Sequence, residues 1–131
     1  MEFHATPWHG ETYDKVTVTG SPNFEQLLSL LEVMRVDSRG SPHRLMMLDL
    51  RASETPLRFT ERLRLGAEVA RTLAHLRGFA LLVPRQRITG VSAKAAQRLG
   101  ANMGVFGSEE EAVEWLMRTS ESGVDSTPAS L

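Results

Sequence analysis

Two short apolar runs constrain the fold of this chain more than any other feature. Residues 45–50 and 79–83 are apolar apart from one carboxylate, Asp49, and turn-forming residues flank each run. Runs of this length are too short for buried helices and are typical of strands that helices cover on both faces. The sequence therefore predicts a central, mostly parallel sheet inside an α/β sandwich.

The segments before the first run predict an antiparallel hairpin at one edge of the sheet. Val16 and Val18 alternate with polar side chains in residues 13–19, which is the pattern of a strand with one wet face. Residues 2–8 are expected to pair with this strand. A further short strand is expected at residues 103–106.

Helical periodicity fills the intervals between these strands. The helices are expected at residues 21–36, 60–76, 89–99 and 108–118, which gives the order ββαβαβαβα for a single-domain α/β fold.

The ends and faces of these helices are predicted from individual residues. Ser21 is expected to cap the first helix, and Gly78 to end the second. Phe59 and Leu63 begin an apolar stripe on the second helix and are expected to be buried. Ser108 precedes three glutamates and forms the pattern of a capping box.

Composition separates one domain from a polar C-terminal segment. Residues 1–118 fit a single domain, while residues 119–131 are rich in Ser and Thr and are expected to be a disordered tail. Residues 1–10 lack a signal-peptide pattern, no run is long enough to span a membrane, and the chain has no cysteine. We expect a cytoplasmic protein without a transmembrane segment.

Charge and motifs argue against several classes of function. The net charge is −1, and thirteen arginines are interleaved with glutamates, so no nucleic-acid partner is expected. The four histidines lie in different elements, and no motif for a metal, a phosphate loop or a nucleophile is present. We expect no enzyme, no metal and no cofactor.

The candidate binding residues follow two neighbouring strands, at the edge where open α/β sheets bind ligands. The sequence places Asp49, Arg51, Ser53 and Thr55 after one strand, and Arg85 and Arg87 after the next. The three arginines are candidates to cradle an anion, or a phosphate on Ser53 or Thr55. The alternative is that these are ordinary solvated loop residues.

Several segments resemble the SpoIIAA-like family. The residues that carry the resemblance are 48–51, 78–84, Ala95-Ala96 and 103–116, where Val105-Phe106 precedes an "EEAxxWL"-like ending. The resemblance implies a STAS-type fold, related to bacterial anti-sigma-factor antagonists and similar in shape to Sec14-type lipid-binding domains. Antagonists are switched by phosphorylation in an Asp-Ser-Ser-Gly-like motif. Ser53 lies near that position, but the motif is missing.

The leading hypothesis is thus a non-enzymatic regulatory domain that binds a protein through the loop after Leu50 and the second helix. The resemblance implies an anti-sigma or kinase-like regulator as the partner, with Ser53 as the candidate phosphorylation site. A small-molecule or lipid binder is the alternative, for which Met34, Met46 and Met47 could line a pocket. A homodimer also remains open.

Overall fold

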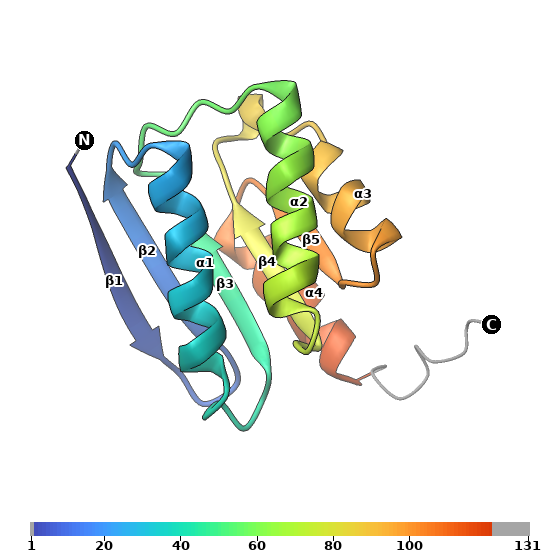
Figure 1. The fold of residues 1–131 in the computed structure, drawn as a ribbon. Helices are drawn as coiled ribbons and strands as arrows, with labels where there is room; N and C mark the ends of the chain where they lie inside the picture. Colours follow the sequence, from blue (N-terminus) through green and yellow to red (C-terminus); the bar gives the residue numbers. More distant parts are fainter. Residues whose placement is uncertain (1, 122–131) are drawn as a thin grey trace.

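A computed structural model describes residues 2–121 as a five-stranded sheet with four α-helices and one 3₁₀ turn (Figure 1). The elements are β1 (Phe3–His9), β2 (Asp14–Gly20), α1 (Phe24–Ser38), β3 (Leu45–Asp49), α2 (Phe59–Leu73), β4 (Gly78–Leu82), the 3₁₀ turn η1 (Arg85–Arg87), α3 (Val91–Arg98), β5 (Met103–Phe106) and α4 (Glu109–Glu121).

The strands lie side by side in sequence order, from β1 to β5. β1 is antiparallel to β2, and the other neighbouring strands are parallel. The predicted edge hairpin and the mostly parallel sheet are therefore both present. The parallel register brings Leu48 of β3 opposite Leu81 of β4 at the centre of the sheet.

Helices cover both faces of the sheet. Helices α1, α2 and α3 lie side by side on one face, and α4 lies behind the sheet on the other (Figure 1). Every residue of β3 and β4 is buried, as the two apolar runs predicted. Met46 joins the core beneath the three helices and Met47 the core beneath α4, so these methionines fill the interior.

Two residues predicted to cap helices, Ser21 and Gly78, do not cap them. Asn23, rather than Ser21, caps α1: its side chain accepts from the Gln26 amide at 2.8 Å, and the Gln26 side chain accepts from the Asn23 amide at 2.9 Å. This reciprocal pair satisfies two amides that Ser21 is too far away to reach. At the other end of α2, the helix ends at Leu73 and Gly78 already belongs to β4.

Helix α4 runs to Glu121, three residues beyond the expected end of the domain. The remainder of the predicted tail, residues 122–131, lies outside the described residues. Within residues 2–121, no helix is both long enough and apolar enough to span a membrane.

Candidate functional site

The parallel strands direct their carboxyl ends to one edge of the sheet, where the loops to α1, α2, α3 and α4 lie. Two of these loops are joined directly. The Glu54 amide donates to the Gly20 carbonyl at 2.8 Å, and Gly20 and Ser53 form an isolated β-bridge. The loop after β3 is therefore held against the end of β2, and its side chains have defined positions.

Ser53 and Thr55 are buried within this loop. The Ser53 hydroxyl donates to the Leu50 carbonyl at 2.8 Å and lies 3.0 Å from the Thr55 hydroxyl. Only 4 % of Ser53 is exposed. A protein kinase needs an accessible hydroxyl, so phosphorylation of Ser53 requires this loop to open first.

Asp49 and Arg51 form a bidentate ion pair. The Arg51 Nε and Nη2 atoms lie 3.0 and 2.9 Å from the two Asp49 oxygens. Burial alone raises the pKa of Asp49, but the hydrogen bonds from the Arg51 side chain and amide outweigh it, and the net pKa lies below its usual value. Asp49 is thus a charged, buried anchor for Arg51.

The acidic start of α4 contacts basic side chains on the side of the sheet that α4 covers. Glu109 accepts from the Tyr13 hydroxyl and from Lys15, both at 3.0 Å, and lies 3.8 Å from Arg51. Burial, with the hydrogen bond and the negative charge of Glu109, raises the pKa of Tyr13 to about 12. The first turn of the same helix also holds Glu111, whose carboxylate lies 3.4 Å from Arg85 Nη2.

The arginine cradle expected from the sequence is therefore divided. Arg51 and Arg85 face carboxylates of α4, whereas Arg87 lines a small pocket between the N-terminal ends of α2 and α3. The second arginine of that pocket is Arg62, which is not among the binding residues predicted from the sequence. The pocket has a volume of about 40 Å³, and Thr55 and Ser92 also line it.

The surface beside this pocket carries exposed apolar side chains. Phe59 is 60 % exposed and Leu63 41 %, and Ile88 is exposed next to Arg87. The prediction that Phe59 and Leu63 are buried is wrong, because α2 turns Leu65, Val69 and Leu73 into the core instead. Two apolar side chains four residues apart on a helix share one face, so they form a continuous exposed patch.

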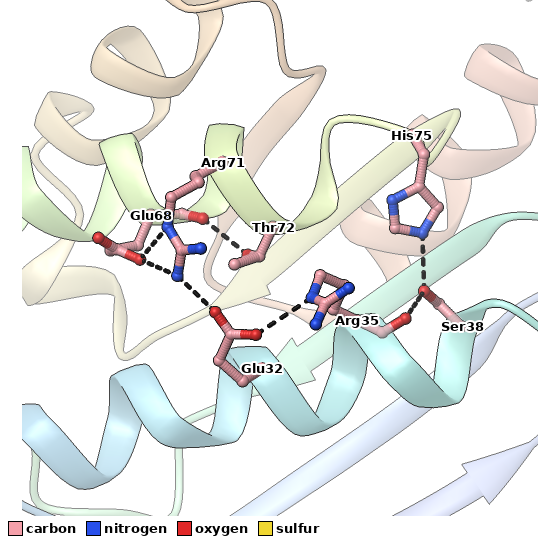
Figure 2. Close-up of polar contacts among 7 residues, drawn as sticks. All are labelled: Glu32, Arg35, Ser38, Glu68, Arg71, Thr72 and His75. Atoms are coloured by element: carbon pink, nitrogen blue, oxygen red, sulfur yellow. Dashed lines mark hydrogen bonds and ion pairs between the residues drawn. The ribbon is translucent and has the colours of Figure 1, made fainter.

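A second polar cluster links α1 to α2 away from this edge (Figure 2). Glu32 of α1 contacts both Arg35 and Arg71, and the Ser38 hydroxyl lies 2.7 Å from His75 Nε2. Ser38 donates to the Arg35 carbonyl, so it accepts from His75. This is the reverse of the hydrogen bond that activates a serine nucleophile. Burial and nearby arginines lower the pKa of His75.

The described part of the chain brings no three His, Asp or Glu side chains together in a way that could hold a metal ion. Two histidines, His9 and His43, lie 3.3 and 3.5 Å from the same Asp14 oxygen. Asp14 is buried and joins the start of β2 to both imidazoles. This contact supports the hairpin and the loop before β3.

Comparison with known proteins identifies the fold. No family model and no curated protein sequence matches the chain. An anti-sigma factor antagonist from Mycobacterium paratuberculosis is similar in structure, with a TM-score of 0.58 and 14 % identity over 88 % of this chain and 95 % of the other. An uncharacterized protein from Shewanella loihica with a SpoIIAA-like fold has a TM-score of 0.51 and 13 % identity over 87 % and 93 %. The chain has the SpoIIAA-like, STAS-type fold that its sequence resembles.

Proposed function

We propose that this chain is a non-enzymatic regulatory domain that binds a protein partner, as anti-sigma-factor antagonists do, and acts in the bacterial cytoplasm. One observation carries the proposal: α2 exposes Phe59 and Leu63 at the carboxyl edge of the sheet. We use the term edge surface for Phe59, Leu63, Ile88, Arg62 and Arg87. The fold of the antagonist from M. paratuberculosis supports this class of function.

The composition of the edge surface suits a protein interface. Aromatic side chains and arginines are enriched where proteins bind one another, and lysines and glutamates are depleted. Burying the exposed 60 % of Phe59 on a partner removes a large apolar ring from water, which stabilises a complex by about 1–2 kcal/mol. The arginines beside it favour a partner whose apolar centre has an acidic rim.

This interaction does not need a phosphorylation switch at Ser53. The Asp-Ser-Ser-Gly-like motif is missing, and the Ser53 hydroxyl is held in the loop by Leu50 and Thr55. We therefore propose an anti-sigma or kinase-like regulator as the partner, with affinity governed by the edge surface. The lipid-binding alternative is not favoured, because Met34, Met46 and Met47 are buried in the core.

Affinity capture from the native lysate tests this proposal. The wild-type chain is compared with a Phe59→Asp/Leu63→Asp variant and with a Val33→Asp/Val36→Asp control. The control changes two valines of α1 that are 62 % and 59 % exposed, so it adds the same charge on a different surface. We expect a regulatory protein to be retained by the wild type and the control and lost from the edge variant.

Two outcomes contradict the proposal. In the first, the partner is retained equally by the edge variant, which places its binding site elsewhere. In the second, no protein is retained while the purified chain turns over a metabolite, which makes it an enzyme.

A further inference from the structure

We propose that the pocket between α2 and α3 binds a phosphate monoester group, either free or carried by a protein. Arg62, the fourth residue of α2, and Arg87, in η1, both line the pocket. Thr89 and Ser92 line the side at the start of α3. Guanidinium and hydroxyl groups are the donors that proteins use to hold phosphate oxygens.

The charges of these two arginines are not compensated by the part of the chain described, residues 2–121. Neither Arg62 nor Arg87 forms an ion pair there, and no carboxylate lines the pocket. Other arginines of the same chain differ, since Arg51, Arg71 and Arg85 each meet a carboxylate. Two positive charges in one pocket favour a dianion over a carboxylate, which neutralises only one of them.

The start of α3 adds further donors. The helix begins at Val91. The preceding residue, Gly90, has a φ of 79°, in the left-handed region, and has no side chain that could cap the first turn. Thr89 Oγ1 accepts from the Val91 amide at 3.3 Å. The next two amides, of Ser92 and Ala93, lie in the first turn and therefore have no carbonyl acceptor within the helix. Thr89, Gly90 and Ser92 line the pocket, so the positive end of the α3 dipole lies at its wall.

The size of the pocket limits the ligand to one such group. A water molecule needs a cavity of roughly 10–15 Å³, so a pocket of about 40 Å³ has room for a few waters or a single phosphate group. A nucleotide base or a lipid chain does not fit inside this volume. Leu50, Leu65 and Leu81 also line the pocket, and apolar walls lower the local dielectric constant, which strengthens an ion pair formed there.

The phosphate site adjoins the edge surface but does not depend on the proposed protein partner. Arg62 and Arg87 belong to both. A free phosphate monoester and a phosphorylated residue of a protein share the chemistry that the pocket recognises. Binding is therefore tested on the purified full chain alone, so a negative result here leaves the proposal of a protein partner untouched.

The experiment is an NMR titration of the ¹⁵N-labelled full chain at constant ionic strength, at a pH well above about 6, where a phosphate monoester is a dianion. Inorganic phosphate is the first probe, a phosphoserine peptide the second, and acetate the matched control. We expect saturable shifts at the amides of residues 89–93 with phosphate and none with acetate. Tighter binding of the peptide assigns the site to a phosphorylated protein, and tighter binding of inorganic phosphate assigns it to a free ligand.

Substitutions assign the binding to the two arginines. Arg62→Gln and Arg87→Gln are each expected to weaken phosphate binding by about tenfold or more, because each removes a hydrogen-bonded charge. Arg98→Gln, at the far end of α3, makes the same charge change and is expected to leave the affinity unchanged. Arg62→Lys keeps the charge but loses the forked guanidinium, so its affinity for phosphate is expected to lie between those of the wild type and Arg62→Gln. The proposal is overturned if phosphate gives no saturable shifts, or if the glutamine variants bind it as tightly as the wild type.

Discussion

The Ser53 hydroxyl stabilises the loop after β3 through its hydrogen bonds to Leu50 and Thr55. We expect Ser53→Ala to lower the free energy of unfolding by about 1–2 kcal/mol, because the hydrogen bonds to Leu50 and Thr55 are lost in a buried place. Ser53→Asp is expected to cost more, since it buries a carboxylate. Urea unfolding measures both changes. Ser29→Ala removes an exposed hydroxyl of α1 and serves as the control, with an expected change within about 0.5 kcal/mol. A fully stable Ser53→Asp protein contradicts this account.

Tyr13 offers a direct readout of the charge at the start of α4. It is the only tyrosine of the chain, so tyrosinate absorbance during an alkaline titration reports this residue alone. The wild type is expected to ionise near pH 12, and Glu109→Gln at a lower pH, because the hydrogen-bonding carboxylate is gone. Glu110→Gln is the matched control.

The same shift has a consequence for stability. The pKa of Tyr13 is higher in the folded chain than the value of about 10 in an unfolded one, so its contribution is present below pH 10 and is lost as the pH rises towards 12. Circular dichroism at each pH separates ionisation of the folded chain from unfolding. Identical titrations of the wild type and Glu109→Gln contradict the contact between Tyr13 and Glu109.

Among the elements, α2 and α3 depend on one glycine for their close approach. A Cβ on Gly66 would lie 2.3 Å from the Ser92 carbonyl oxygen and 2.7 Å from the Ala95 Cβ. Alanine favours the helix by about 1 kcal/mol, but the clash with a backbone oxygen forces two backbones apart, at a cost in the upper part of the range of about 1–3 kcal/mol, and opens the core beneath them. We expect Gly66→Ala to lower the free energy of unfolding by about 1–2 kcal/mol.

Gly40→Ala is the matched control, because a Cβ there meets nothing within 4 Å. Its expected change is within about 0.5 kcal/mol in the same urea experiment. Equal stabilities of the two variants contradict the tight packing of α2 on α3.

The contact at Gly66 also explains why periodicity failed on α2. Apolar spacing from Phe59 and Leu63 predicted a buried stripe, yet the helix packs through Leu65, Gly66 and Val69. A glycine adds little to a hydrophobicity pattern, although its missing side chain is what allows α3 to approach. The exposed patch that carries the proposed function was therefore hidden from sequence reasoning. Its only trace in the sequence is that Phe59 and Leu63 form a second apolar row beside Leu65, Val69 and Leu73.

At the scale of the whole molecule, patterns within single segments predicted the fold well. The breaker-bounded runs at 45–50 and 79–83 gave the central strands, and the alternation at Val16 and Val18 gave the edge hairpin. The site was predicted only in part, because it depends on which loops meet. Arg51, Arg85 and Arg87 all follow strands at the carboxyl edge, but Arg51 and Arg85 turn to Glu109 and Glu111, and the binding role of all three stays a prediction. Pairing between residues far apart in the chain leaves no trace in one sequence.

The most direct test of the proposed function is calorimetric titration of the captured, purified partner into the wild-type chain and into single variants. We predict that Phe59→Asp weakens the complex by about tenfold or more, as expected for an aromatic residue at the centre of an interface. Val36→Asp on α1 is predicted to leave the affinity unchanged. Equal affinities of the wild type and Phe59→Asp would contradict the assignment of the edge surface as the binding site.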